Sequence, residues 1–327
     1  MNASDNNVNP DSVTLTYSNN SIKDEALRYR RKGFGLVIAL IIALLYLFIF
    51  PELLKKIYPT KITNEGAFQY WTMICIGWFG YTFFNFIMYI IYHLEWPFFE
   101  KYKVTKNPWP WNDKNEDWPG TLKKTLITLF INHFICTPVI SLEALIKNKP
   151  NYRISPDTFP STFEIAWQIV LFMVCDDFCF YWSHRFLHWD KIYVALHKKH
   201  HQYIHTIGLS ASYSTPIDFI SGVLSAFLCP LILGKRAHLI TLWMWTLLRI
   251  AETTDGHCGY EFSWSPFRLI PFSGSAEFHD HHHSGFKGNY SSMFTIWDRI
   301  CGTVNQTYIE YIENKRIELD EDSNKSK

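Results

Sequence analysis

Histidine is the residue type whose number and spacing in this sequence indicate chemistry most directly. Twelve of the 14 histidines lie between positions 184 and 283, as H-x-x-x-H at 184–188 and H-x-x-H-H at 197–201 and 279–283. Side chains three and four residues apart share one face of a helix, so each group would present two or three imidazoles in one direction. The predicted metal ligands are His184, His188, His197, His200, His201, His257, His279, His282 and His283.

Nine imidazoles are too many for one metal ion, which rarely takes more than about six ligands. Two ions with four or five ligands each would use all nine. Imidazole suits zinc, copper, iron and nickel, but a zinc site usually closes with four ligands, or with three and a water. The surplus of ligands therefore predicts two iron ions per chain, while ligand type alone leaves zinc open.

Three carboxylates are expected to accept hydrogen bonds from the outer ring nitrogens and so orient the imidazoles. Asp177 lies seven residues before His184, on the same helical face, and Asp255 and Asp280 adjoin predicted ligands. An acidic residue inside an apolar segment is costly and usually functional. The alternative for Asp177 is that it lies with Asp176 at the membrane interface and faces water.

The remaining histidines are expected to play other parts, because a lone histidine is more often structural or exposed than metal binding. On that basis we assign structural roles to His93, His133 and His238, and we leave open whether His205 and His281 are additional ligands. Three spaced groups beside apolar segments make a chance arrangement a poor explanation for the other nine.

Long apolar segments must position these histidines, and they indicate a membrane protein. The segments are 34–50, 67–92, 125–145, 163–182, 219–233 and 239–250. Spanning the hydrocarbon core takes about 20 residues, with a lower limit of about 17. We expect four spans before His184, with a re-entrant or interfacial helix as the alternative for 125–145. The last two segments are short, so a hairpin entering the membrane partway is as acceptable as two crossings.

The orientation follows from basic residues and from the shared site. Arg28, Arg30, Arg31 and Lys32 precede the first span, which predicts a cytosolic N-terminus. The histidines on both sides of the last apolar pair can share a site only if that pair returns the chain to its starting side. We therefore predict an all-α, multi-span integral membrane protein with both termini in the cytosol and a cytosolic, histidine-rich helical cap that holds a di-metal site.

The expected organisation has four parts. They are a disordered polar segment over 1–24, a membrane region with two or three spans over 25–160, a catalytic domain with membrane segments over 161–307, and a polar tail over 308–327. The first apolar run begins only at Phe34 and is not followed by a clear cleavage site, so no signal peptide is expected.

Composition excludes several other classes of protein. The net charge of the 327-residue chain is +1 and no basic stripe with interleaved aromatic residues is present, so no nucleic-acid partner is expected. The seven cysteines are an odd number and lie mostly in apolar runs, which predicts reduced thiols rather than a disulfide framework.

The motifs resemble the fatty acid hydroxylase superfamily, which includes sterol desaturases, methylsterol monooxygenases and fatty acid hydroxylases. The resemblance covers roughly 162–307 and rests on the three histidine groups around apolar segments. The stretches most similar to the methylsterol monooxygenases are HHQYIHTIGLSASY at 200–213, HCGYEFSW at 257–264 and AEFHDHHH at 276–283.

The resemblance implies an oxidoreductase of the endoplasmic-reticulum membrane that contains two irons. Such an enzyme would use O2 and take electrons from NAD(P)H through cytochrome b5 and its reductase. The implied substrate is a sterol bearing methyl groups at ring carbon 4, and the implied activity is that of a methylsterol monooxygenase in sterol biosynthesis.

Two departures from the family pattern keep other lipid oxidations open. Methylsterol monooxygenases usually carry a histidine before a proline where this chain has Thr215 before Pro216, and Thr253 stands four residues before His257, where relatives acting on fatty acids have histidine. Sterol side-chain hydroxylation or dealkylation, sterol desaturation and fatty acid hydroxylation therefore remain alternatives.

Two further classes are disfavoured. A membrane metal transporter would place its polar ligands near the bilayer midplane in broken spans, whereas here the histidine groups lie outside the apolar runs. A zinc hydrolase of the H-E-x-x-H type is not indicated, because that motif is absent from the sequence.

Overall fold

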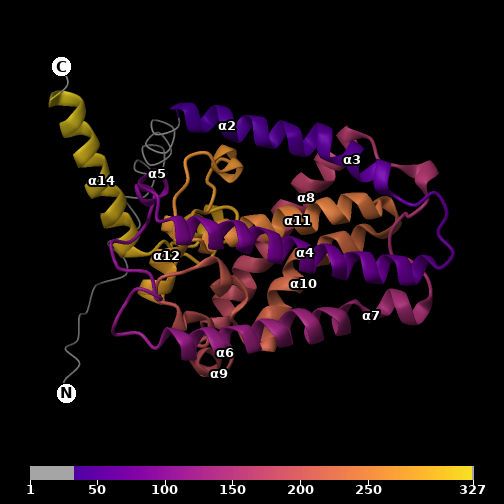
Figure 1. The fold of residues 1–327 in the computed structure, drawn as a ribbon, viewed down its shortest axis with the longest axis horizontal. Helices are drawn as coiled ribbons and strands as arrows, with labels where there is room; N and C mark the ends of the chain where they lie inside the picture. The colour runs from indigo at the N-terminus through magenta and orange to yellow at the C-terminus, as the bar shows by residue number, and fades with distance from the viewer. Residues whose placement is uncertain (1–32, 326–327) are drawn as a thin grey trace.

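The computed structural model describes residues 33–325, and over that range the regular secondary structure is helical (Figure 1). The first half contains α2 Gly33–Leu44, η2 Leu45–Ile49, α3 Phe50–Ile57, α4 Glu65–Leu94, α5 Pro97–Glu100, α6 Trp118–Phe130, η3 Ile131–Cys136, α7 Thr137–Lys147 and η4 Pro156–Thr158. The second half contains α8 Thr162–Leu187, α9 Asp190–Leu196, η5 His200–Gln202, η6 Gly208–Ser212, α10 Pro216–Leu233, η7 Gly234–Arg236, α11 Leu239–His257, η8 Pro266–Leu269, α12 Ala276–Gly285, α13 Ile296–Ile300 and α14 Gln306–Lys325. Of the η elements, η2 and η3 are π-helices and the others are 3₁₀-helices.

Polar caps explain where several of these helices begin. The side chains of Asn64, Ser161 and Ser275 accept hydrogen bonds from backbone N–H groups in the first turns of α4, α8 and α12. Thr215 does the same for α10, with Pro216 following it in the first turn. Such caps satisfy N–H groups that have no partner within the helix.

The long helices run back and forth along the molecule, and α12 and α14 lie at one end (Figure 1). The starts of α2 and α10 and the ends of α4, α8 and α11 lie at this end. Contacts that place them there are Gly35 with Ser263, the Tyr92 hydroxyl with the Cys258 carbonyl, and Asp218 with His197. The expected return of the chain through the last apolar pair is confirmed, because α10 leads away from the histidines and α11 leads back.

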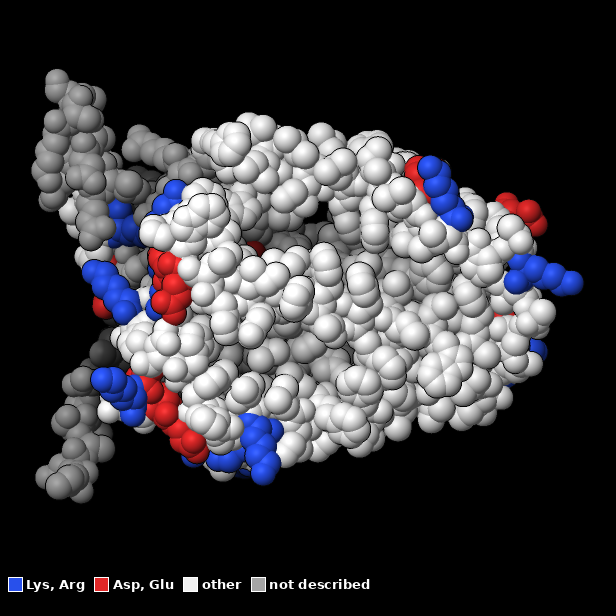
Figure 2. All heavy atoms as spheres, in the orientation of Figure 1, with Lys and Arg blue, Asp and Glu red and all other residues white. Residues whose placement is uncertain are grey.

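Four helical segments are long and apolar enough to cross a membrane, within residues 33–325 and by length and composition. They are Gly33–Ile57, Glu65–Leu94, Trp118–Lys147 and Pro216–Arg236. The segment expected at 125–145 as a span or a re-entrant piece is a continuous helix with the π-helix η3 at its centre. The uncharged surface between the two ends of the molecule in Figure 2, with charged residues gathered at those ends, fits a membrane-spanning body.

The expected span at 163–182 is not among these four by composition, although α8 leads back to the end that carries the histidines (Figure 1). Helix α8 buries Asp176 and Asp177, which are 0% and 1% exposed, while Phe163, Val170 and Val174 on other parts of its surface are 54–79% exposed. Both aspartates face the protein interior, so the alternative that they face water at the membrane interface is wrong. Asp176 pairs with Arg249 of α11 at 2.6 Å, and a buried charge of this kind needs a partner inside the protein.

Helix α11 forms the centre of the core. Thirteen of its 19 residues are buried, and they include every residue from Leu239 to Leu247, so this half of the helix is covered on all sides. Trp245 and Met244 pack with Phe172 of α8 and Ala226 of α10. The segment at 239–250 is therefore an internal helix rather than half of a shallow hairpin.

The all-α class is confirmed over the described residues, together with a histidine cluster that could hold metal. The segment predicted as disordered, 1–24, lies outside the described residues. The predicted polar tail largely coincides with a helix, α14, from Gln306 to Lys325.

Candidate metal centre

The nine predicted histidines come together from four places in the fold. His184 and His188 lie at the end of α8, His257 ends α11, and α9 with η5 carries the group at 197–201, while α12 carries the group at 279–283. Eight of the nine are buried, and His188 is partly buried. The helix ends thus deliver imidazoles to one enclosed region.

The histidines sort into two groups, and within each group the candidate ligand atoms all lie within 4.8 Å of one another. The five-histidine group is His184, His188, His197, His201 and His282, and the four-histidine group is His200, His257, His279 and His283. Neighbouring residues in the H-x-x-H-H motifs are divided between the groups, so each motif serves both. This division matches the predicted number of ligands for two metal ions. His205 and His281 belong to neither group.

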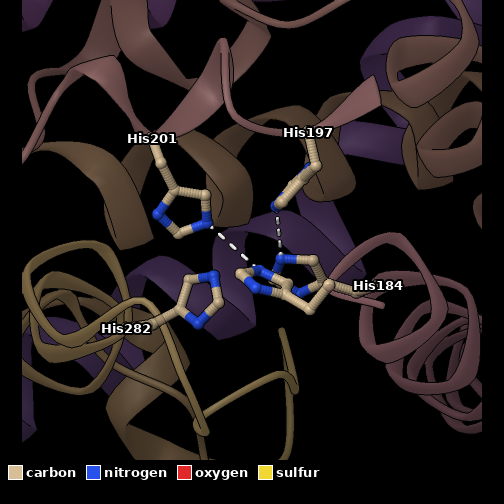
Figure 3. A group of neighbouring side chains, drawn as sticks. His184, His197, His201 and His282 are labelled. Atoms are coloured by element: carbon tan, nitrogen blue, oxygen red, sulfur yellow. Dashed lines mark hydrogen bonds between the residues drawn. The ribbon is translucent and has the colours of Figure 1, made fainter. Parts of the chain in front are cut away.

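In the five-histidine group, hydrogen bonds fix which nitrogen faces inward. Nδ1 of His184 donates to the carbonyl of Tyr290 at 2.7 Å, and Nδ1 of His197 donates to Asp218 at 2.8 Å. Each ring therefore has its lone pair on Nε2, and these two Nε2 atoms lie only 3.0 Å apart. Figure 3 shows the labelled rings of this group turned toward one another. Facing lone pairs repel each other unless a cation binds them.

His282 also belongs to this group, and it gives the clearest test of whether the group fits a metal ion. Its Nδ1 donates to the carbonyl of Gly288 at 2.7 Å, and its Nε2 is buried without a hydrogen-bond partner among the described residues. A buried polar atom without a partner is costly. An Nε2 lone pair aimed at other Nε2 atoms is the arrangement that a transition-metal ion requires.

The four-histidine group follows the same rule. Nδ1 of His257 donates to the Thr253 carbonyl, and Nδ1 of His283 donates to the Tyr203 carbonyl, both at 2.8 Å. Their Nε2 atoms lie 2.9 and 3.1 Å from Nε2 of His279. The residues present in both groups therefore fit metal ions bound through Nε2.

Burial keeps these imidazoles neutral. Loss of water contact, with repulsion from neighbouring histidines, lowers the pKa of His201 to about 3. Burial is also the main cause that lowers the pKa of His257 to about 4. A neutral imidazole is the form that binds a metal, so both groups are ready to bind at neutral pH.

The three predicted carboxylates make other contacts. Asp177 accepts from the backbone N–H of Phe294 at 2.9 Å, Asp255 pairs with Arg268 at 2.8 Å, and Asp280 pairs with His205 at 3.3 Å. None of these partners belongs to the nine histidines. The expected role of the three carboxylates in orienting the ligands therefore stays a prediction, and no direct contact supports it.

The carboxylate that does contact a candidate ligand is Asp218, which the sequence interpretation missed. Its Oδ2 lies 2.8 Å from Nδ1 of His197, and its side chain is 11% exposed. A signal was present, because Asp218 is an acidic residue at the edge of the apolar segment 219–233. The argument applied to Asp177, that an acid beside apolar residues is usually functional, applies to it equally.

Replacing Asp218 by alanine should weaken metal binding roughly 10- to 100-fold, since a carboxylate that orients a metal-binding imidazole typically contributes that much. Asp218→Asn should retain more affinity, because the amide oxygen can still accept from Nδ1 of His197. Metal affinity is measured by competition with a chelator. Asp190→Ala is the control, since Asp190 is exposed at the start of α9, and equal losses in Asp218→Ala and Asp190→Ala would contradict the assignment.

A cavity of about 360 Å³ reaches the histidines between α4, α7, α8, α10 and α11. His184, His197, His200, His257 and His279 line it on one side. Its apolar walls include Met73, Phe180, Phe219, Phe227, Ile250 and Met293. The volume lies within the usual range for small-molecule sites, so an apolar ligand can lie beside both histidine groups.

The fold and this site define a multi-span membrane protein whose histidines can hold two metal ions beside an apolar cavity. Residues 169–303, which include all nine histidines, match the family model described as fatty acid hydroxylase. Methylsterol monooxygenase 2-2 of Arabidopsis thaliana is 34% identical over 253 residues, covering 74% of this chain and 88% of that protein. The chain belongs to the fatty acid hydroxylase family.

Other relatives show how wide the similarity is. Methylsterol monooxygenase 1 of Gallus gallus is 34% identical over 220 residues, covering 67% of this chain and 71% of that protein. Very-long-chain aldehyde decarbonylase GL1-11 of Oryza sativa subsp. japonica is 32% identical over 212 residues, covering 63% and 74%. No solved structure matches the chain.

Proposed function

We propose that this protein is a membrane-bound di-iron monooxygenase that oxidises the C4-methyl group of a sterol. The observation that carries the proposal is the placement of two all-imidazole groups against an apolar cavity. The relatives named methylsterol monooxygenase in plant and bird support the reaction and the substrate class.

Iron, two per chain, is the proposed metal. A group of five imidazoles exceeds the three or four protein ligands that zinc usually takes, whereas iron accepts imidazole ligands at higher coordination numbers. Bound iron would supply the redox chemistry that activates O2. One oxygen atom enters a C–H bond of the methyl group and the other leaves as water, consuming two electrons and two protons. The proposed electron source is NAD(P)H, through cytochrome b5 and its reductase.

The chain's own residues hold the substrate and the ligands in place. Phe180 and Met293 form part of the apolar wall beside the histidines, which excludes water from the reacting carbon. The carbonyls of Tyr290 and Gly288 and the carboxylate of Asp218 fix the orientation of three rings. Rigid ligands of this kind set the distance between the metals and the substrate.

The proposed location is the endoplasmic-reticulum membrane, with both termini and the histidines on the cytosolic side. The basic run from Arg28 to Lys32 supports this orientation. The start of α2 lies at the same end of the molecule as the histidines, because Gly35 adjoins Ser263 near η8. Cytochrome b5 would then deliver electrons on the side of the membrane that carries the metal site.

The reaction is tested with purified protein in detergent, supplied with iron, O2, NADH, cytochrome b5 and its reductase. The expected result is about two irons per chain by elemental analysis and conversion of a 4,4-dimethylsterol to its 4-hydroxymethyl product, identified by mass spectrometry. Hydroxylation of the sterol side chain alone would reject the C4 assignment. Zinc alone after iron-replete expression would reject the oxygen chemistry.

A very-long-chain aldehyde is the control substrate, since one relative is named for acting on that class. We expect no alkane from it. Alkane formation without sterol oxidation would assign the chain to that activity instead.

A further inference from the structure

A second hollow lies next to the cavity that reaches the histidines. This groove, of about 730 Å³, runs between α4 and the α6–η3 segment. Its lining includes Phe86, Leu126, Phe130 and Phe134, whose side chains are 50–58% exposed. These residues lie on two membrane-spanning segments, so the groove faces lipid, on helices that contribute to the uncharged surface in Figure 2.

Three residues line both the groove and the cavity: Trp78, Tyr81 and His133. They form a thin partition between the lipid-facing groove and the histidine side. The rings of Tyr81 and His133 are in tilted contact with centroids 4.3 Å apart, and Trp78 stacks on Phe134 at 4.4 Å. The two hollows are therefore separated by one layer of side chains.

The sequence around Pro138 explains why Trp78 bonds to His133 in this partition. In η3 the backbone N–H of Thr137 bonds to the carbonyl of Asn132, and the next residue, Pro138, has no N–H to donate. The carbonyl of His133 thus lacks a donor in its own helix. The indole N–H of Trp78 donates to it at 2.8 Å, which supplies the bond that a backbone carbonyl in a membrane requires.

His133 also carries an unused polar atom. Its Nε2 is buried and has no hydrogen-bond partner among the described residues. Tyr81 beside it uses its hydroxyl on the carbonyl of Leu209 at 3.1 Å. A buried ring nitrogen without a partner inside an aromatic wall fits a ligand with an apolar body and a single hydroxyl, which is the chemistry of a sterol.

We propose that the groove between α4 and α6–η3 is the entry site for the sterol substrate, and that Trp78, Tyr81 and His133 form the gate between this groove and the reaction cavity. The proposal rests on the proposed function for its choice of ligand. Opening the gate separates the stacked rings of Trp78 and Phe134 and breaks the hydrogen bond from the Trp78 indole N–H to the His133 carbonyl. The sterol enters from the bilayer and its hydroxyl meets Nε2 of His133 on the way.

A pair of adjacent substitutions tests the site. Leu126 and Ile127 have nearly equal exposure, 53% and 52%, but only Leu126 lines the groove. Leu126→Trp should raise the KM for the sterol roughly fivefold or more by filling the groove, while kcat and iron content stay at the wild-type level. Ile127→Trp should change none of these. Equal KM values in both variants would overturn the proposal.

A second readout does not depend on turnover. A photoreactive sterol, mapped by peptide mass spectrometry, should label the segment 122–134 in wild type and in Ile127→Trp, and much less in Leu126→Trp. Labelling confined to α10 would place entry on another side and overturn the proposal. If wild type oxidises no sterol but this labelling pattern holds, the entry site stands and the proposed reaction fails.

Discussion

His282→Ala should abolish sterol oxidation and remove metal from the five-histidine group. The substitution deletes the one Nε2 in that group that is buried without a partner among the described residues. Loss of a residue that only orients a ligand already costs roughly 10- to 100-fold, so loss of a direct ligand should reduce turnover by roughly 100-fold or more. Metal content is expected to fall from about two ions per chain to one or none, measured by elemental analysis.

The control lies in the same helix. His281 belongs to neither group, and its Nδ1 bonds to the carbonyl of Glu277 within α12. His281→Ala should therefore keep its metal and nearly all of its activity. Full activity in His282→Ala, or in the equivalent variants of His200, His201 or His283, would remove that residue from the ligand set.

Arg249→Met should destabilise the protein by about 3–5 kcal/mol, the usual cost of breaking a buried ion pair from one side. Arg249 is 10% exposed and pairs at 2.6 Å with both Asp176 and Glu252. Without the guanidinium, two carboxylates are left buried without a cation. The expected result is a large fall in the thermal unfolding midpoint in detergent, with iron bound in both samples.

Two variants identify charge as the cause. Arg236→Met removes an exposed arginine and should change the free energy of unfolding by about 0.5 kcal/mol or less. Replacing Arg249, Asp176 and Glu252 together by apolar residues of similar volume should recover most of the lost stability. A triple variant as unstable as Arg249→Met would show that lost packing, rather than unpaired charge, is responsible.

The histidine spacing was enough to choose nine residues that the structure brings together in two groups, whose binding of metal stays a prediction. Imidazoles three or four residues apart share a helical face whatever the rest of the fold, so the nine candidates could be chosen without contacts between distant segments. The division of His200 from His201 between two groups could not be predicted in that way. It depends on how α11 and α12 approach η5, which is set by packing.

The errors concern residues whose environment depends on tertiary contacts. Asp176 was considered only as a residue that faces water at the membrane interface, but its partner Arg249 lies 73 residues away on another helix. Asp218 was missed because its partner, His197, lies 21 residues earlier in the sequence, too far for helical spacing to connect the two. In the apolar segment 163–182, α8 buries its two aspartates and exposes Val170 and Val174, a division that the length of the segment alone does not reveal.

The division of ligands across the sequence has a consequence for biosynthesis. The five-histidine group needs His282, which leaves the ribosome 81 residues after His201, a delay of roughly 4–16 s at ordinary rates of synthesis. The four-histidine group likewise joins His200 to His257 and to residues of α12. A nascent chain therefore carries only partial ligand sets until the hairpin of α10 and α11 has been inserted and α12 has folded back. On the proposed function, loading of both metal ions would therefore be a late event in synthesis.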